Sequence, residues 1–288
     1  MPVWARRLLH EPRFVAGAVL TLIVVFMALA STFASPHDPL DQDLINQLLP
    51  PIWVEGGNPD YLLGTDGLGR DRLSRLLYGA RVALYVAVLA ATGAALLGTI
   101  LALVGGYFGG WIDWTISRAV DVWQAIPPVV LALILMVAFG AGLNNVVLAI
   151  IVVDWTRFCR VIRADVLNVM QQNYVASARM AGFTHRLTIL REVLPAIVPL
   201  LLTMLSLEMG IAVVVEAILS FVGMSVEANV SAWGVMIADA RPDLNQAPFG
   251  LFLPVLAILI TVLGFNLLGD GLRRALDPRL RTSRTEAA

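Results

Sequence analysis

The chain has 288 residues, of which 58% are hydrophobic and only 14% are charged. Soluble domains carry roughly 25% charged residues, so this composition excludes an ordinary soluble protein and indicates an integral membrane protein. All 20 basic residues are arginine, and a chain without lysine cannot form the G-x-x-x-x-G-K-[ST] phosphate-binding loop, so we expect no ATP binding of that kind.

The first predicted element is a transmembrane helix near the N-terminus. Phe14–Ser35 is an uncharged run of 22 residues, and about 20 apolar residues in a helix cross the hydrocarbon core of a bilayer. Arg6 and Arg7 before this run and Ala28-Leu29-Ala30 near its end also fit a secretory signal peptide. Because the run is long for a signal peptide, we expect residues 1–35 to form a cytoplasmic N-terminus and an uncleaved first span.

Residues 36–81 form a predicted extracytoplasmic segment. Gly69–Tyr78 fits a short amphipathic helix, because its leucines lie near one helical face. The segment would either cap a pathway or dock a partner, or it would be a lid packed on its own bundle. Five prolines keep the first half extended or turned: Pro36, Pro39, Pro50, Pro51 and Pro59.

The core, residues 82–272, contains further uncharged or nearly uncharged runs. Val122–Val153 would be nearly 50 Å long as one helix, which exceeds the hydrocarbon core of about 30 Å. Gly140–Asn145 is a turn signal that divides it into two spans, the second at about 143–156. Pro127-Pro128 should kink the first of these or end a short helix before it. The remaining predicted spans lie in Val82–Ile112, Val193–Val226 and Leu244–Gly269.

The arginines test this count of six spans. Arginine concentrates on the cytoplasmic side of membrane proteins. With six spans, both termini are cytoplasmic, residues 273–288 form a cytoplasmic tail, and residues 157–195 form a long cytoplasmic loop. Fifteen of the 20 arginines then lie inside: Arg6, Arg7, Arg13, Arg118, Arg157, Arg160, Arg163, Arg179, Arg186, Arg191, Arg273, Arg274, Arg279, Arg281 and Arg284.

The loop 157–195 places small and apolar residues on one helical face. Val175, Ala178 and Gly182 share this face, and small side chains allow another surface to approach closely. Gly182 is a predicted helix end, because glycine adopts the left-handed conformation at low cost, and Pro195 fits the first turn of the next span. The loop would either dock on a soluble partner or pack only on its own protein.

Three acidic residues lie within apolar runs. Ionisable groups at membrane depth are costly and are often functional. Glu208 lies near the middle of its predicted span, where it would either contact a substrate amine in an aqueous path or pair with a polar group inside the bundle. Glu216, a second candidate for the path, and Asp154 lie nearer the span ends, where solvation or helix capping explains them.

Catalysis and metal binding have no support in the residue pattern. The chain has neither a G-x-S-x-G nor an H-E-x-x-H motif, so we expect no enzymatic activity. His10, His37 and His185 lie far apart, and we expect no metal site. The single cysteine, Cys159, excludes an intrachain disulfide and fits a small packing residue.

Several segments resemble, in chain order, the C-type membrane permeases of dipeptide and oligopeptide ABC importers (the peptide/nickel group). They are LGTDGLGRD at 63–71 before the second span, GYFGGWID at 106–113 before the third, SFVGM at 220–224 with Trp233-Gly234 in the last outer loop, and FNLLGDGLR at 265–273 with LDPR at 276–279 near the C-terminus. The resemblance runs from about residue 36 to residue 281.

The loop 157–195 resembles the ATPase-coupling segment of this family, E-A-A-x3-G-x9-I-x-L-P. The spacing is intact, but Ala176 replaces the glutamate, Ser177 the first alanine and Glu192 the isoleucine. The polar part of the implied ATPase contact is therefore altered. The outer motif S-F-L-G-x-G also departs from the family, because it ends in Ser225. The coupling residues implied by the resemblance are Tyr174, Ala176, Ser177, Ala178, Gly182, Leu194 and Pro195.

The resemblance implies an all-α type I ABC importer permease fold with six transmembrane helices and a cytoplasmic coupling helix, in the inner membrane. It implies three kinds of protein partner: a homologous second permease, two ATPase subunits (or one fused ATPase) that bind ATP and Mg²⁺, and an extracytoplasmic substrate-binding protein. This chain would form half of the pathway for dipeptides and oligopeptides by alternating access. It would contact membrane lipid and no nucleic acid.

Two alternatives remain open from the sequence. Related permeases also carry nickel chelates or glutathione, and nothing in the spans separates these substrates from dipeptides. A function from another class is an ATP-independent channel or secondary carrier, which would need intramembrane charges or a broken helix near the midplane. Glu208 is the main residue that favours this alternative.

Overall fold

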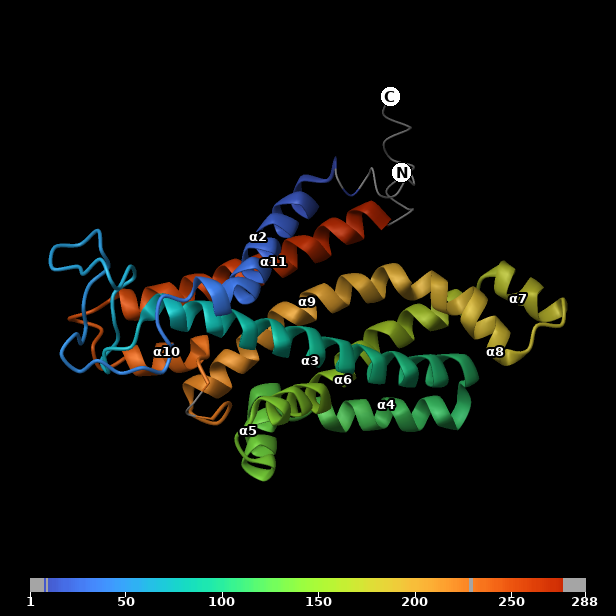
Figure 1. Ribbon diagram of the computed structural model, residues 1–288. Helices are drawn as coiled ribbons and strands as arrows, with labels where there is room; N and C mark the ends of the chain where they lie inside the picture. Colours follow the sequence, from blue (N-terminus) through green and yellow to red (C-terminus); the bar gives the residue numbers. More distant parts are fainter. Residues whose placement is uncertain (1–7, 9, 228–229, 277–288) are drawn as a thin grey trace.

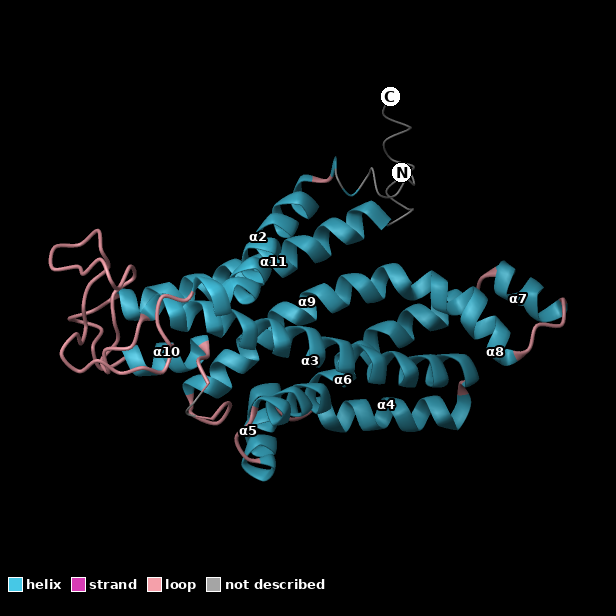
Figure 2. Ribbon diagram, viewed as in Figure 1, coloured by secondary structure: helices cyan, strands magenta, loops and turns pink. Residues whose placement is uncertain are grey.

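The computed structural model describes residue 8, residues 10–227 and residues 230–276, which fold into a bundle of α-helices (Figures 1 and 2). Apart from one isolated bridge between Thr65 and Asp71, these residues form no β-structure, which confirms the all-α fold class. The elements are α2 (Pro12–Ala34), α3 (Arg72–Phe108), α4 (Gly110–Gln124), α5 (Pro128–Phe139), α6 (Leu143–Met170), α7 (Asn173–Met180), α8 (His185–Thr188), a π-helical turn (Ile189–Val193), α9 (Leu194–Phe221), α10 (Trp233–Ala240) and α11 (Phe249–Leu276).

Four described helical segments are long and apolar enough to cross a membrane: α2, α3, the continuous segment His185–Phe221, and α11. Helices α4 and α5 together would make a fifth span, although they meet at an angle of 87°. Helix α6 is 28 residues long but contains Asp154, Arg157, Arg160 and Arg163. The structure thus confirms a multi-pass bundle of four or five apolar spans, and α6 as a sixth span stays a prediction.

The predicted breaks in the chain are confirmed on either side of α5. Helix α4 ends at Gln124 and α5 begins at Pro128, because proline has no N–H and its ring clashes within a continuing helix. The turn between α5 and α6 falls at Gly140 and Gly142, both with positive φ. These two breaks place α5 as a short segment across the bundle, which Figure 1 shows in light green.

Helix α3 packs extensively against α6 through small residues. Ala90, Ala94, Gly98 and Ala102 recur every four residues, and the three alanines are fully buried. A Cβ atom at position 98 would lie 2.5 Å from the backbone oxygen of Trp155, so only glycine allows this approach. Cys159 is buried in the same region, which confirms its packing role.

The prediction of a separate amphipathic helix at 69–78 is wrong. Helix α3 begins at Arg72, with Asp71 as its N-cap, and continues without a break into the apolar run. Gly79 does not end the helix; the indole of Trp233 packs where its side chain would be. The helix instead ends before Gly109, where φ is +66°.

The bundle has two distinct ends (Figure 1). The loop between α2 and α3 lies with α10 at one end, and α7 and α8 lie at the opposite end. Helices α2 and α11 pack side by side, and Arg13 near the start of α2 pairs with Asp270 near the end of α11 at 3.3 Å. The described N-terminal and C-terminal ends therefore lie on the same side of the bundle.

Candidate functional site

The predicted coupling segment forms a compact turn at the end of the bundle. Helix α7 buries Val175 and leaves Ala176 and Ser177 exposed, with Ala178 half-buried. It ends in a paired hydrogen-bond pattern in which the Gly182 N–H donates to the Arg179 oxygen (3.0 Å) and the Phe183 N–H donates to the Ala178 oxygen (3.2 Å). Gly182 has φ of +88°, which confirms it as the helix end.

The second arm of this turn continues directly into α9. Thr184 caps α8, since its Oγ1 accepts the Leu187 N–H, and Pro195 lies in the first turn of α9 as predicted. The π-helical turn Ile189–Val193 lies immediately before Pro195. A wider turn fits there because the proline ring would clash with the carbonyl four residues earlier. The turn at Gly182 thus connects α6 to α9.

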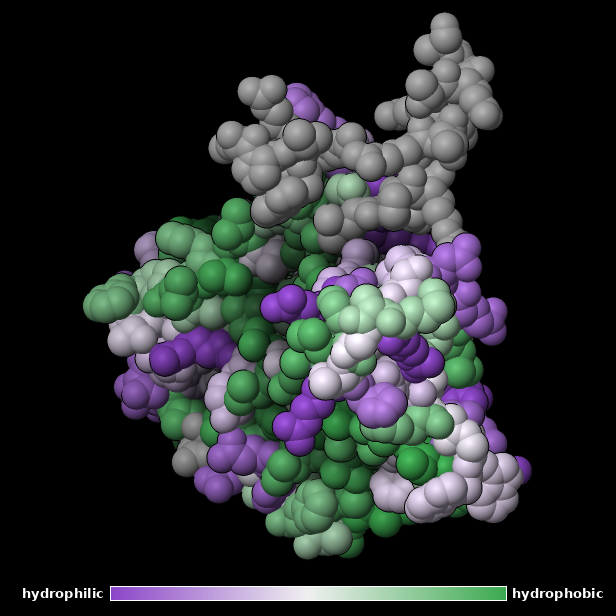
Figure 3. All heavy atoms as spheres, turned by 90° about the vertical axis from the view of Figure 1, so that its right-hand side faces the viewer, coloured by the Kyte–Doolittle hydropathy of each residue, from purple (hydrophilic) through white to green (hydrophobic). Residues whose placement is uncertain are grey.

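A cluster of side chains fixes the turn to the end of α3. The Tyr107 hydroxyl lies 2.9 Å from Nδ1 of His185, and the Arg179 guanidinium carbon lies 4.9 Å from the centre of the Tyr107 ring. Tyr107 is buried. Figure 3 views the molecule from this end and shows hydrophilic residues in purple scattered among apolar residues in green. The turn is therefore exposed on its outer side and anchored on its inner side.

Tyr174 lies at the start of α7, with 45% of its surface exposed. Partial burial raises the pKa of its hydroxyl, and the charges of Glu192 and Asp165 raise it further. The phenol is therefore neutral at physiological pH and can donate a hydrogen bond to a partner. Ala176, beside it, has no carboxyl group to contribute to such a contact.

Glu208 is buried in the middle of the bundle and is ion-paired. Its Oε2 accepts a hydrogen bond from Nη1 of Arg157 at 3.1 Å, whereas Nη2 of Arg157 lies 3.7 Å from Oδ1 of Asp154. Asp154 is 3% exposed and Glu208 1%. The carboxyl groups of Asp154 and Glu208 also hydrogen-bond to each other. The interpretation of Asp154 as a solvated or capping residue is therefore wrong.

Glu216 is also buried, two turns farther along α9, and does not join this cluster. Its Oε1 accepts hydrogen bonds from the hydroxyls of Ser220 and Ser225, so the solvated interpretation of Glu216 is wrong as well. Ser225, which replaces the family glycine, supplies one of these donors. The backbone oxygen of Ser225 also accepts the Gly142 N–H at 2.8 Å, which joins the end of α9 to the start of α6.

A cavity of about 360 Å³ lies at the elbow between α4 and α5. Its apolar wall includes Trp123, Ile126 and Leu131, and its polar wall includes Asp154 and Arg157 from α6. The volume lies within the usual range for small-molecule sites. A broken helix and buried charges therefore meet at one place.

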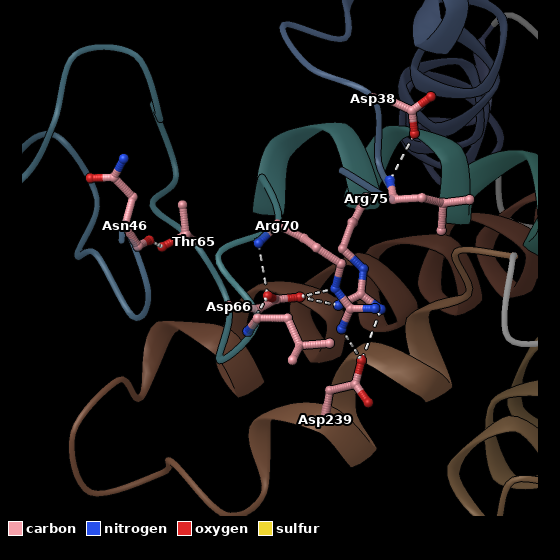
Figure 4. A network of polar contacts seen from close by, with 9 residues as sticks. Asp38, Asn46, Thr65, Asp66, Arg70, Arg75 and Asp239 are labelled. Atoms are coloured by element: carbon pink, nitrogen blue, oxygen red, sulfur yellow. Dashed lines mark hydrogen bonds and ion pairs between the residues drawn. The ribbon is translucent and has the colours of Figure 1, made fainter. Parts of the chain in front are cut away.

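The opposite end of the bundle contains a second ion-pair network (Figure 4). The side chains of Arg70 and Arg75 both lie between two carboxylates, those of Asp66 and Asp239. Nη2 of Arg70 lies 2.7 Å and Nη2 of Arg75 lies 2.9 Å from Oδ2 of Asp239. The network joins the loop between α2 and α3, the first turn of α3, and α10.

Asp66 remains ionised within this network. Burial alone would raise the pKa of its carboxyl group, but the charges of Arg75 and Arg70 and the N–H groups of Arg70 and Leu68 outweigh burial and hold the pKa below 3.8, its ordinary value. Asp66 and Arg70 belong to the segment 63–71 on which the resemblance depends.

Sequence reasoning missed most of the partners in these sites. Arg157 follows Asp154 by three residues, a helical spacing that could have indicated the pair. Tyr107 and His185, and likewise Arg75 and Asp239, are too far apart in sequence for any spacing rule. Their contacts emerge only from the packing of whole helices.

Comparison with known proteins gives consistent matches along the chain. Residues 94–282 match the family described as binding-protein-dependent transport system inner membrane component, and residues 3–51 match the N-terminal transmembrane domain of oligopeptide transport permease C. The dipeptide transport system permease protein DppC of Haemophilus influenzae is 37% identical over 265 residues, which cover 92% of this chain and 90% of that protein.

Two further relatives and a solved structure extend this result. The glutathione transport system permease protein GsiD of Pectobacterium atrosepticum is 36% identical and covers 96% of this chain and 90% of its own length. The di/tripeptide transport system permease protein DppC of Pseudomonas aeruginosa is 36% identical, with 95% and 90% coverage. A crystal structure of an amino acid ABC transporter with histidines has the same fold, with a TM-score of 0.55 and 19% identity over 70% of this chain and 94% of that one. The chain therefore belongs to the family of binding-protein-dependent transport system inner membrane components.

Proposed function

We propose that this chain is the membrane permease subunit of an ATP-driven, binding-protein-dependent importer of dipeptides and oligopeptides. The names of the relatives support a peptide substrate, since they include dipeptide, di/tripeptide and glutathione permeases. In this proposal the chain catalyses no reaction. It forms half of a pathway with a second permease, while ATPase subunits bind ATP and Mg²⁺ and a binding protein delivers the peptide.

The observation that carries the proposal is the connection made by the turn at Gly182. This turn joins α6, which contains Asp154 and Arg157, to α9, which contains Glu208. Force applied to the exposed turn would therefore act on the two helices that share the buried ion pairs. An ATPase that moves the turn could in this way change the pathway between two states, as alternating access requires.

The topology proposed for the importer has six spans: α2, α3, α4 with α5, α6, α9 and α11. The turn at Gly182, the start of α2 and the end of α11 would then be cytoplasmic. The network of Asp66 and Asp239 would face the binding protein. The concentration of arginine in residues 157–191 favours this orientation. Helix α7 would be the coupling helix that docks on an ATPase.

The test is transport by the four-subunit complex with its binding protein in proteoliposomes. We expect uptake of labelled Ala-Ala only when both ATP and the binding protein are present, with ATPase activity stimulated by the loaded binding protein. The broken helix at Pro127-Pro128 beside buried charges is also what an ATP-independent carrier would use. Uptake of Ala-Ala by the complex without ATP would support that carrier and contradict the importer.

A further inference from the structure

We propose that Asp154 and Glu208 together bind a single proton, and that this proton allows α6 and α9 to separate without leaving a buried charge unpaired. Asp154 lies on α6 and Glu208 on α9. The inference deepens the proposed function, and its second half rests on it, because the separation is a movement that an ATPase would drive through the turn at Gly182. The proton site itself follows from the contacts between the two acids.

The two acids meet inside the bundle. Both are buried, and their carboxyl groups hydrogen-bond to each other. Such a hydrogen bond requires a hydrogen on one of the two groups, because an ionised carboxylate can only accept. Two ionised carboxylates in contact would also repel each other strongly in this buried setting. The pair therefore holds one proton and carries one negative charge.

One arginine balances that charge and lies beside both acids. Nη1 of Arg157 lies 3.1 Å from Oε2 of Glu208, and Nη2 of Arg157 lies 3.7 Å from Oδ1 of Asp154. Arg157 follows Asp154 by three residues on the same helix, so these two side chains remain neighbours wherever α6 moves. Glu208 belongs to the other helix. Its contact with Arg157 must therefore break if α6 and α9 separate.

Most other charged groups on the helices around the pair have partners of their own. Helix α3 is uncharged from Val82 to its end, and α5 contains no charged residue. The other acid of α9, Glu216, accepts hydrogen bonds from serine hydroxyls. The ion pairs on α4, α6 and α11 are Arg118 and Arg160 with Asp121, Arg163 with Asp113, and Arg13 with Asp270. The pair of acids therefore depends on Arg157 for its balance.

The proton makes the separation of α6 and α9 electrically neutral. When the helices part, Arg157 pairs with Asp154 on its own helix, and the proton stays on Glu208 as a neutral carboxylic acid. The hydrogen bond between the two acids breaks, the O–H bond remains on Glu208, and no charge is created or lost. Without the proton, one acid would be left as an unpaired carboxylate inside the bundle, which is costly.

The cavity at the α4–α5 elbow gives this site access to water and room for the exchange of partners. Asp154 and Arg157 both line it, and its volume of about 360 Å³ holds several water molecules. Arg160, whose side chain is 51% exposed, lies at its edge. A proton lost from the pair can be replaced from this side. The Arg157 side chain is 39% exposed, so it has space to turn from Glu208 toward Asp154.

The first test detects the proton. Infrared difference spectra of the four-subunit complex in nanodiscs distinguish the carbonyl stretch of a protonated carboxyl group from the bands of a carboxylate. We expect Glu208→Gln and Asp154→Asn each to remove one protonated-carboxyl band that shifts in heavy water, because the acid that remains pairs with Arg157 in its ionised form. Asp113→Asn is the matched control, since Asp113 pairs one-to-one with Arg163 and should remove no such band. Spectra in which neither variant removes a band overturn the proton site.

The second test compares the same two variants in import. In Glu208→Gln the remaining ion pair, Arg157 with Asp154, lies within α6, so separation of the helices breaks no ion pair. In Asp154→Asn the remaining pair joins Arg157 to Glu208 across the two helices and must be broken. We therefore expect import of Ala-Ala by Asp154→Asn to be at least about a hundredfold slower than by Glu208→Gln. Equal import by the two variants, or the reverse order, overturns the role of the proton in the separation.

Adding Arg157→Gln to Asp154→Asn distinguishes an electrostatic lock from misfolding. Glu208 then has no cation beside it, so it takes up a proton of its own and no ion pair joins the helices. We expect faster import than in Asp154→Asn alone, together with return of the protonated-carboxyl band. If neither recovers, the inference is contradicted. If wild type imports Ala-Ala by ATP hydrolysis but the variants do not follow this order, the inference fails while the proposed function stands. If wild type does not import, the infrared spectra still test the proton site.

Discussion

The hydroxyl of Tyr107, in the last turn of α3, lies 2.9 Å from Nδ1 of His185, the first residue of α8. Arg179 of α7 lies over the same tyrosine ring. The turn at Gly182 is therefore attached to α3 as well as to α6 and α9. Because α3 runs the length of the bundle to Arg75 in the network of Asp66 and Asp239, Tyr107 is in a position to pass movement of the turn to the opposite end.

The first prediction concerns this attachment. Tyr107→Phe removes the hydroxyl but keeps the ring, and we expect the amount of Ala-Ala imported per ATP hydrolysed to fall by roughly threefold to tenfold, as for a lost hydrogen bond of about 1 kcal/mol. ATPase activity should be retained. Tyr85→Phe is the control, because it removes a hydrogen bond to Asn144 from the opposite half of α3. An unchanged import ratio in Tyr107→Phe would show that the contact does not transmit movement.

The second prediction concerns Gly182. Gly182 has a φ of +88°, and this left-handed conformation would cost a residue with a side chain about 1–2 kcal/mol. No atom lies within 4 Å of the position that a Cβ atom would take there. A tryptophan at this position would project from the exposed turn into the space where an ATPase would dock. We expect Gly182→Trp to abolish import while the complex still hydrolyses ATP, with a melting temperature close to that of wild type.

Gly182→Asn is the matched control for that experiment, since asparagine adopts the left-handed conformation more readily and is small. It should retain most import. Wild-type import by Gly182→Trp would refute the assignment of the turn as the ATPase contact. Loss of import in both variants would attribute the effect to backbone strain at Gly182 and not to docking.

The sequence predicted those parts of the fold that depend on local composition. The apolar run at 14–35, the division at Gly140, and the helix end at Gly182 follow from run length or from backbone preference, and the structure confirms them. The start of α3 was missed because Arg72, Arg75 and Arg81 interrupt the apolar pattern, so the uncharged run begins only at Val82. Arg75 is buried there because Asp239, 164 residues away, neutralises it.

For the candidate site, too, the sequence predicted the local features but not the contacts between helices. Spacing placed Ala178 and Gly182 on one helical face and Pro195 in the first turn of the next span, but it could not reveal that Tyr107 holds the turn at Gly182 in place. Glu208 was recognised as a buried acid, yet its partner Arg157 is 51 residues distant. Contacts between helices depend on the crossing and rotation of entire helices, and neither is encoded in a local pattern.

The third prediction compares Asp66 and Asp239, the two acids that pair with Arg70 and Arg75. Asp66→Asn would leave Arg75, whose side chain is 3% exposed, without its most buried anion, and breaking a buried pair costs about 3–5 kcal/mol. The side chain of Asp239 is 35% exposed, so we expect its replacement to lower the stability less. We expect Asp66→Asn to lower the melting temperature of the complex in detergent more than Asp239→Asn does. The reverse order would mean that α10, and not the loop between α2 and α3, determines the stability of this end of the bundle.

The last prediction follows from the lowered pKa of Asp66. A carboxyl group whose folded pKa lies below its unfolded value of 3.8 contributes stability at higher pH and loses that contribution as the pH falls through the folded value. The N–H groups of Leu68 and Arg70 donate to Asp66 at 2.9 Å. Their rates of hydrogen exchange therefore measure whether the Asp66 carboxylate keeps these hydrogen bonds. We expect their protection from hydrogen exchange, corrected for intrinsic rate, to be equal at pH 7 and pH 5 and to be lost only below the ordinary value. Asp66→Asn should show weak protection at each pH. Loss of protection in wild type between pH 7 and pH 5 would contradict an Asp66 held ionised by Arg70 and Arg75, since that carboxylate takes up no proton in this interval.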